Sequence, residues 1–328
     1  MKTIFNLLAT LLLIFNVLAQ DPLTHEKKIH KKEDGKVYVN KSLPIYLSIS
    51  TNANGSGGEV LDGKDPKYSS PMFLDSEGYN TIRTPWKVDP ETKKTVYPKE
   101  EVIFELYADS KAPATSISYG EVKTVSEEGK ILLMPTEITL TSKDETSGVA
   151  GIYYSLDNGT YQKYSSPIAV KTEKAYSLKY YAVDFVGNVE DAKSVSIQID
   201  GTAPVTKMDI EGDLSENVVS ARSSFTLSSE DNISGVAKTF YTIDEGRTFE
   251  YGSPITLSRL SEGEHTLTYF SVDKVDNNEE KKSYSFYLDK SAPRVIDEII
   301  GNTFIANGKE YYSGRTKLKL VAMDNKSG

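Results

Sequence analysis

Hydrophobic and polar residues alternate along many short stretches of the chain after residue 37. Apolar side chains at every second position are typical of half-buried antiparallel strands, and the Gly, Asn, Asp and Pro clusters between the stretches are typical of turns. No stretch beyond the first 19 residues keeps a helical period. The pattern therefore predicts an all-β protein. The alternating positions include Ile138, Leu140, Leu178, Tyr180, Ala182, Val195, Ile197 and Ile199.

Three motifs recur in the same order at a period of about 90 residues. Asp-x-x-Ala-Pro begins at Asp109, Asp200 and Asp289, so its prolines lie 91 and 89 residues apart. Residues 144–168 and 231–255 match without a gap and are identical at 12 of 25 positions. A unit of this length with several short strands predicts an immunoglobulin-like β-sandwich, here in tandem.

The N-terminus has the pattern of a cleaved secretory signal. One Lys precedes an apolar run from Ile4 to Leu18, and Val17 and Ala19 suit a signal peptidase. A retained membrane anchor is the alternative, although the run is short for a spanning helix. We therefore expect export across the inner membrane, to the outer membrane surface, the periplasm or the medium.

The sequence suggests six segments. Asp324 follows Pro293 by 31 residues, as Asp144 follows Pro113, so the last segment should hold only the first strands of a repeat. We expect a signal peptide at 1–19, a flexible charged tail at 20–36, an N-terminal β domain at 37–110, immunoglobulin-like repeats at 111–202 and 203–290, and the truncated start of a third repeat at 291–328.

The amino-acid composition limits the kinds of site and partner that the chain can have. The chain has no Cys, which excludes disulfides and thiolate metal sites, and its net charge of −9 argues against a nucleic-acid partner. His25 and His30 fall in the charged tail, and Tyr176 replaces His265 in the other repeat, so we expect His265 to be structural. We expect Trp86 to pack in a core rather than to stack on a sugar. No GxSxG, HExxH, P-loop or Rossmann pattern appears in a strand–helix context, and we predict that the chain is not an enzyme.

Two glycine-containing turns are expected to close hairpins. Asp157–Gly159 and Asp244–Gly246 each follow an apolar strand, and we expect their glycines to take positive φ. Pro167 and Pro254 are expected to begin edge strands, because proline cannot donate to a sheet ladder.

Aspartates are placed where loops of the sandwich should meet. In an immunoglobulin-like sandwich, the start of strand A, the B–C loop and the F–G loop share one pole. Oxygen-rich loops of this kind suit Ca²⁺, which would offset the repulsion and stiffen a string of domains. The alternative is that these aspartates only close Asx turns. The predicted sets are Asp109, Asp144 and Asp184, then Asp200, Asp231 and Asp273, with Asp289 and Asp324 beginning a third.

The order D-x-x-S-G-V-A, Y-x-x-D-x-G, Y-x-S-P-I, Y-x-x-V-D-x-x-x-N and D-x-x-A-P resembles bacterial immunoglobulin-like repeats. It is most similar to the repeat named after a leptospiral 47-kilodalton outer-membrane protein, and also resembles the C-terminal sandwich module of chitobiases. The likeness covers residues 111–290 and part of 291–328; the F–G loop is not constant, since Gly187-Asn188 becomes Asp276-Asn277.

The resemblance implies an exported envelope or cell-surface protein with a structural, spacer or adhesive role. It implies an unspecified protein or glycan partner at the cell surface. The alternative is the non-catalytic accessory region of a larger secreted polysaccharide-acting enzyme. A glycan array on residues 37–290 would separate sugar binding from a purely structural role.

Overall fold

A computed structural model of the chain describes residues 23–60, 70–83, 87–97, 103–324 and 326. These residues form strands, turns and loops, and none of them belongs to a helix that could span a membrane. Contacts divide the chain into two units, Met1–Ile199 and Asp200–Gly328. The expected signal peptide and Trp86 lie outside the described residues.

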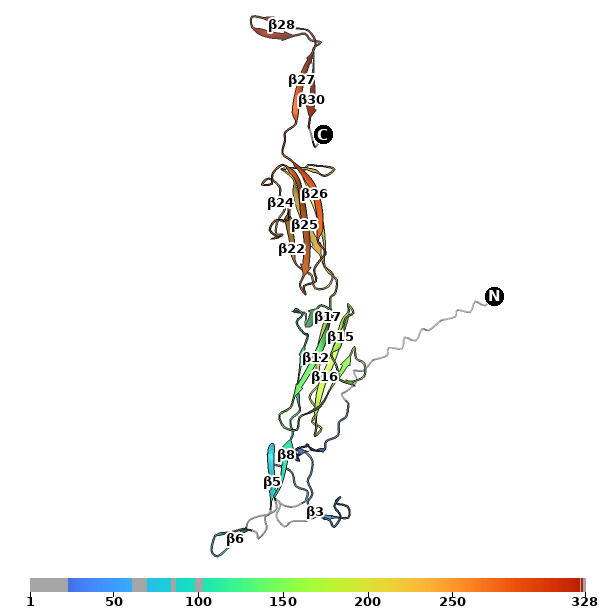
Figure 1. The fold of residues 1–328 in the computed structure, drawn as a ribbon, viewed down its shortest axis with the longest axis vertical. Helices are drawn as coiled ribbons and strands as arrows, with labels where there is room; N and C mark the ends of the chain where they lie inside the picture. The colour runs from blue at the N-terminus through green and yellow to red at the C-terminus, as the bar shows by residue number, and fades with distance from the viewer. Residues whose placement is uncertain (1–22, 61–69, 84–86, 98–102, 325, 327–328) are drawn as a thin grey trace, which may run out of the picture. The chain divides into compact units, whose positions relative to one another are not determined.

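The first unit begins with a four-stranded sheet in the order β1-β2-β8-β5. Figure 1 labels β5 and β8 of this sheet. β2 and β8 are parallel, whereas β1–β2 and β5–β8 are antiparallel. Val39, Leu74 and Ala108 form its small buried cluster. The strands are β1 (Ile29–Lys31), β2 (Val37–Asn40), β5 (Gly78–Arg83) and β8 (Ile103–Asp109), with two separate ladders of β3 (Ser48–Ile49) and β4 (Glu59–Val60), and of β6 (Lys87–Val88) and β7 (Thr95–Val96).

Strand β1 differs from the expectation of a flexible tail over residues 20–36. Ile29 pairs with Val39 and Lys31 with Val37, so the segment is part of the sheet. The strand has only three residues, too few to show alternation. Its position depends on contacts with residues far along the chain, which local charge and periodicity do not report.

Repeat 1 is a sandwich of a six-stranded and a three-stranded sheet. The larger sheet has the order β10-β11-β17-β16-β13-β14, with one parallel pair, β11–β17. Its strands are β10 (Thr124–Glu127), β11 (Lys130–Leu133), β13 (Val149–Leu156), β14 (Gln162–Lys163), β16 (Ala175–Asp184) and β17 (Lys193–Ile199). The smaller sheet, β15-β12-β9, contains β9 (Ala114–Ser118), β12 (Thr136–Lys143) and β15 (Ile168–Val170).

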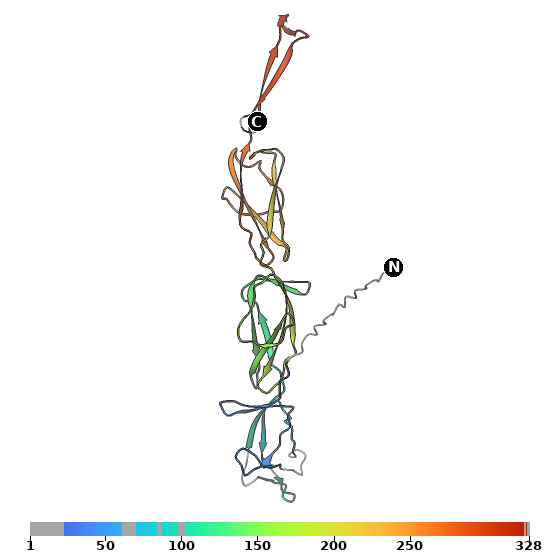
Figure 2. The same cartoon turned by 90° about the vertical axis from the view of Figure 1, so that its right-hand side faces the viewer.

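The core of repeat 1 lies between these two sheets, whose ribbons are green in Figure 2. Ile138 and Leu140 of β12 share one buried cluster with Leu178 of β16 and Ile197 and Ile199 of β17. Burying each such side chain contributes about 1.5–3 kcal/mol. The alternation seen in the sequence therefore marks the inner faces of the two sheets, and the predicted all-β, immunoglobulin-like fold is confirmed.

Repeat 2 has the same two-sheet architecture. Phe225 and Leu227 of the smaller sheet pack with Leu267, Phe286 and Leu288 of the larger one. The smaller sheet contains β18 (Val205–Glu211), β21 (Ser224–Glu230) and β24 (Ile255–Thr256), and the larger contains β19 (Leu214–Ser215), β20 (Val218–Ser220), β26 (Lys282–Asp289), β25 (Gly263–Asp273), β22 (Val236–Ile243) and β23 (Phe249–Glu250).

The remaining residues form two antiparallel ladders, β27 (Arg294–Ile300) with β30 (Lys317–Met323), and β28 (Thr303–Ala306) with β29 (Lys309–Tyr312). β27 and β30 pair over seven residues, as β18 and β21 do in repeat 2. Leu318 and Leu320, which correspond to buried Phe225 and Leu227, are 61% and 62% exposed. These strands follow the first-strand pattern of a repeat and leave its apolar face uncovered.

The hairpin turns form where expected, but different residues take the positive φ. Asp157 and Asn158 have φ of 53° and 58°, whereas Gly159 is not in the left-handed region. A type I′ turn needs positive φ at both central residues, and Asp and Asn tolerate it. Glycine is favoured next because a Cβ at Gly159 would lie 3.1 Å from the Leu156 carbonyl oxygen, a tight contact that the backbone would have to relieve by a small shift.

Candidate metal site

Each repeat carries one cluster of three aspartates. In each cluster every residue offers a carboxylate oxygen that lies within 4.8 Å of the other two. The first and third aspartates are buried and the second is half-buried. The structure thus brings together both complete sets that were expected to converge: Asp109, Asp144 and Asp184, and Asp200, Asp231 and Asp273.

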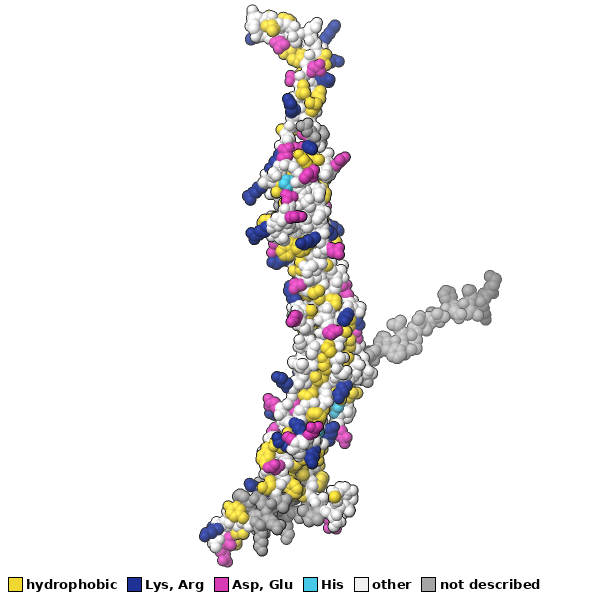
Figure 3. Space-filling view, in the orientation of Figure 1, with side chains coloured by type: hydrophobic (Ala, Val, Ile, Leu, Met, Phe, Trp, Pro, Cys, Tyr) yellow, Lys and Arg dark blue, Asp and Glu magenta, His cyan; other side chains and the backbone are white. Residues whose placement is uncertain are grey.

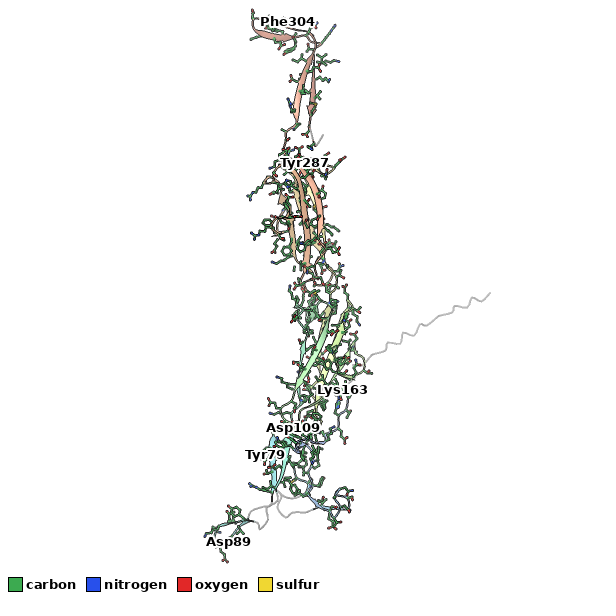
Figure 4. All side chains as sticks on the ribbon, viewed as in Figure 1. Tyr79, Asp89, Asp109, Lys163, Tyr287 and Phe304 are labelled. Atoms are coloured by element: carbon green, nitrogen blue, oxygen red, sulfur yellow. The ribbon has the colours of Figure 1, made fainter. Side chains whose placement is uncertain are left out.

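Strand ends position these side chains. Asp109 is the last residue of β8 (Figure 4), Asp184 is the last of β16, and Asp144 directly follows β12. Three backbone segments therefore deliver carboxylates to one point. The second cluster uses the same places: Asp273 ends β25, Asp231 follows β21, and Asp200 follows β17.

The half-buried aspartate of each cluster closes an Asx turn with one oxygen only. Oδ1 of Asp144 accepts the N–H groups of Thr146 and Gly148, at 3.1 and 2.6 Å. Oδ1 of Asp231 accepts the corresponding amides, at 3.1 and 2.7 Å. Oδ2 of both residues accepts no hydrogen bond from the described part of the chain. The turn hypothesis therefore describes part of the geometry and leaves one oxygen available.

An asparagine links the carboxylate of the third aspartate to the backbone of the first. Asn188 donates through Nδ2 to Oδ2 of Asp184 at 2.7 Å and to the Asp109 carbonyl at 3.2 Å. Asn277 repeats both bonds in the second cluster, at 2.6 and 3.1 Å. The asparagine holds the Asp184 or Asp273 carboxylate beside the backbone of Asp109 or Asp200 without neutralising its charge.

A buried serine lies beside each cluster. The backbone N–H of Ser147 donates to Oδ2 of Asp109 at 3.0 Å, and Ser234 does the same to Asp200 at 2.9 Å. The side-chain Oγ of each serine is buried and makes no hydrogen bond of normal geometry, although it lies close enough to the Asp109 or Asp200 carboxylate to lower the pKa of that group. Buried hydroxyls normally make well-formed hydrogen bonds, so each Oγ has lone pairs available for a further ligand.

The electrostatics of the clusters is unfavourable without a cation. Burial raises the pKa of Asp109, and the nearby Asp144 carboxylate adds to this rise by repulsion. Burial and Asp231 raise the pKa of Asp200 in the same way. The side chains of Ser147 and Ser234, followed by backbone N–H donors, oppose the rise but do not cancel it. A bound cation would stabilise the charged carboxylates and reverse the shift.

The donor set fits a hard cation. Ca²⁺ binds oxygen ligands at about 2.3–2.6 Å, so ligands on opposite sides of the ion are about 5 Å apart. The 4.8 Å limit on the carboxylate oxygens is compatible with one shared ion. Carboxylate oxygens and the serine Oγ are all hard ligands, and loop geometry suits the flexible coordination of Ca²⁺ better than the strict octahedron of Mg²⁺.

The first cluster has an additional support from the N-terminal sheet. Asn40, the last residue of β2, donates to Oδ1 of Asn188 at 2.8 Å and to the Val186 carbonyl at 3.2 Å. The Lys41 amide donates to the Asp109 carbonyl at 2.9 Å. These bonds connect the N-terminal sheet to the loop that holds the cluster.

The expected third set is partly assembled. Asp289 accepts the Ser291 amide and Asp324 accepts the Lys326 amide, each at 2.9 Å. Both aspartates line one open cavity with Asp213 and Arg222. Within the described residues no third carboxylate oxygen, that of Asp213 included, completes a set within 4.8 Å.

The histidines have packing contacts. His265 is buried in β25, where Nδ1 lies 2.5 Å from Oδ2 of Asp244 and Nε2 lies 2.8 Å from the Ser261 carbonyl. His25 and His30, placed in the tail by the sequence analysis, contact different aromatic residues of repeat 1. The described geometry therefore supports a structural role for His265 and does not form a site from the other two.

Charges of both signs are mixed over the surface that Figure 3 shows. Lys and Arg side chains alternate with Asp and Glu along both units, without a large basic field on this face. The expectation that nucleic acid is not a partner stays a prediction.

Comparisons with known proteins give similarities to solved structures only. No protein-family model matches the chain, and no curated protein matches it. Fibronectin(III)-like modules of Clostridium thermocellum CbhA are 15% identical, with a TM-score of 0.32, over 54% of this chain and 95% of theirs. A structure from a 1.5-MDa bacterial ice-binding adhesin is 12% identical, with a TM-score of 0.28, over 57% of this chain and 69% of its own. The D00-D0 domain of intimin is 10% identical, with a TM-score of 0.24, over 54% of this chain and all of its own.

No function follows from similarities at this level. The two-sheet topology and the core define the chain as an all-β protein of tandem immunoglobulin-like sandwiches. The resemblance to the leptospiral repeat stays a prediction.

Proposed function

We propose that the chain is an exported bacterial envelope or surface protein whose tandem sandwiches act as a structural or adhesive module. The support is the secretory pattern of residues 1–19 together with two successive repeats of one architecture. A chain of such domains extends a binding surface or spaces it from the membrane. No described feature favours the alternative of an accessory region in a polysaccharide-acting enzyme.

We further propose that each three-aspartate cluster binds one structural Ca²⁺. The observation that carries this proposal is the duplicated geometry, in which three oxygens lie within 4.8 Å of one another in both repeats. The buried Oγ atoms of Ser147 and Ser234, which make no hydrogen bond of normal geometry, offer one further oxygen ligand to each cluster. The ion would join the start of strand A to the B–C and F–G loops, and so hold the end of each sandwich in one conformation.

The cellular proposal is tested in the bacterium that encodes the chain. Antibodies raised against the mature chain should label intact cells, or the protein should be recovered from the periplasm or the medium. The precursor should be longer than the exported form, with Gln20 as the mature N-terminus. Retention of an unprocessed chain in the cytosol would contradict the proposal.

The metal proposal is tested by melting the mature chain in EDTA and in added CaCl₂. Calcium should raise the melting temperatures of both repeats, and MgCl₂ at the same concentration should raise these temperatures less. Identical transitions in EDTA and calcium would contradict the proposal.

A further inference from the structure

Residues 23–31 lie against one face of repeat 1. The Leu23 amide donates to the Tyr181 hydroxyl at 2.9 Å, and Nε2 of His25 lies 3.1 Å from the same oxygen. The His25 ring also packs on Tyr153, with 4.9 Å between ring centroids. Tyr181 is fully buried under this contact. We call residues 23–31 the strap.

The strap makes further contacts along the F–G loop of repeat 1. The His30 ring stacks on Phe185, with centroids 4.4 Å apart and an interplanar angle of 14°. The Lys28 amide donates to the Val186 carbonyl at 3.0 Å. Backbone and ring contacts thus alternate along the segment, as in the recognition of an extended peptide.

The absence of a side chain at Gly187 leaves room for the strap. Its φ is +89°, and a Cβ there would lie 2.2 Å from the Glu26 carbonyl oxygen and 3.0 Å from the Cα of Lys27. The first distance is far inside van der Waals contact. Any side chain at residue 187 would therefore push the strap away from the loop.

Repeat 2 supplies an internal comparison. Asp276 corresponds to Gly187 and takes φ of 74°, while Lys274 corresponds to Phe185 and Phe270 to Tyr181. Phe270 lacks the hydroxyl that binds Leu23 and His25 in repeat 1. The positions that contact the strap differ between the repeats, whereas the three aspartates are kept. The face of repeat 1 is therefore specialised beyond what the fold requires.

We propose that Tyr153, Tyr181, Phe185 and Gly187 form a peptide-docking face whose ligand is the strap of the same chain. β1 of the strap pairs with β2 of the N-terminal sheet, so docking clamps that sheet to repeat 1. Burial and the nearby Lys28 lower the pKa of His25 in the docked strap. The clamp adds a second connection to the one that Asn40 makes beside the aspartate cluster.

The test uses Gly187→Asp in the full mature chain. Asp276 shows that this fold accepts Asp at a similar φ, so the substitution acts mainly through the clash with the strap. Amides of the strap, Lys28 above all, should exchange with deuterium at least about tenfold faster, while amides of β13 and β16 keep their protection. Asp276→Gly is the matched control and should leave the strap unchanged. Unchanged protection of the strap in Gly187→Asp would overturn the proposal.

A second measurement does not depend on that variant folding. A chain lacking residues 20–31 should bind a fluorescent synthetic peptide of residues 20–32 saturably, as seen by anisotropy. The same peptide with His25→Ala should bind at least about tenfold more weakly, because it loses one hydrogen bond and the ring contacts with Tyr153 and Tyr181. Absence of binding by the deletion chain would overturn the docking face.

Light scattering distinguishes a strap that docks on its own chain from a strap that docks on a second copy of the chain. A monomer with a protected strap supports the proposed arrangement. A dimer whose strap loses protection on dilution would assign the face to the strap of a second copy, and would overturn docking within one chain.

Discussion

Replacing Asp231 by Asn should leave repeat 2 as stable as the wild type, or slightly more stable, in the absence of calcium. In the presence of calcium the same variant should be less stable than the wild type. Oδ1 of Asp231 accepts both amide hydrogen bonds of its turn, and Asn can keep them with its own Oδ1. The substitution therefore removes one negative charge and one oxygen ligand while preserving the turn. Few positions separate the turn hypothesis from the metal hypothesis so directly.

The magnitude follows from the geometry of the cluster. Two charges 4.8 Å apart repel by about 3.5 kcal/mol at an effective dielectric constant of about 20. Solvent at half-buried Asp231 reduces this to about 1 kcal/mol. Without calcium, Asp231→Asn should thus melt at the wild-type temperature or a few degrees above it.

Calcium should stabilise the wild type much more than the variant. For a dissociation constant near 10⁻⁴ M, 2 mM calcium adds about 1.8 kcal/mol to a domain. For a domain of this size that corresponds to a rise of about 7–14 °C in melting temperature. Asp231→Asn should lose most of this rise in the repeat 2 transition.

Scanning calorimetry of the mature chain, in EDTA and in calcium, measures both effects. Asp213→Asn is the matched control, because Asp213 is an exposed carboxylate of the same unit that pairs with Arg222 outside the cluster. The control should keep the calcium-dependent rise. If Asp231→Asn lowers the melting temperature equally in both buffers, the residue acts only through its turn and the reasoning is refuted.

Three further predictions concern repeat 2. Burial alone would raise the pKa of Glu279, but Lys282 and amide donors hold this pKa below its usual value. The ionised Glu279 therefore stabilises the fold above about pH 4.5, and this stabilisation is lost as the pH falls. Glu279→Gln should make the urea midpoint less sensitive to acid. Burial alone would lower the pKa of His265, but the Asp244 carboxylate raises it. The protonated His265 therefore stabilises the fold fully below about pH 6.5, and this stabilisation is lost as the pH rises. The urea midpoints of the wild type and His265→Tyr should differ more at pH 6 than at pH 9. Leu267→Ala should cost about 2–5 kcal/mol, because the side chain is fully buried, and a loss below 1 kcal/mol in urea titration would contradict the assigned core.

Much of the fold could be predicted because strand alternation is a local property. Leu178 and Ile197 are apolar at every second position, and both are buried between the sheets. Strand β5 was not foreseen, because its six residues include several polar ones and its pairing with β8 is distant in sequence. The docking of the strap was not predicted for the same reason: its partners, Tyr181 and Phe185, lie more than a hundred residues away in the sequence.

The aspartate clusters could be predicted from topology, because a sandwich brings fixed loops to one pole. The roles of Ser147 and Asn188 were missed, although both repeats carry a residue of the same type at these positions. Comparing the repeats position by position would have singled them out. Their roles depend on side-chain direction and burial, which the sequence pattern does not contain.

Calcium titration of the mature chain by isothermal calorimetry tests the central claim most directly. The account predicts saturable binding at the two complete clusters, loss of one site in Asp144→Asn, loss of the other in Asp231→Asn, and loss of both in the double variant. Heats that are indistinguishable from dilution up to about 10 mM calcium, well above the usual range for extracellular sites, would contradict it.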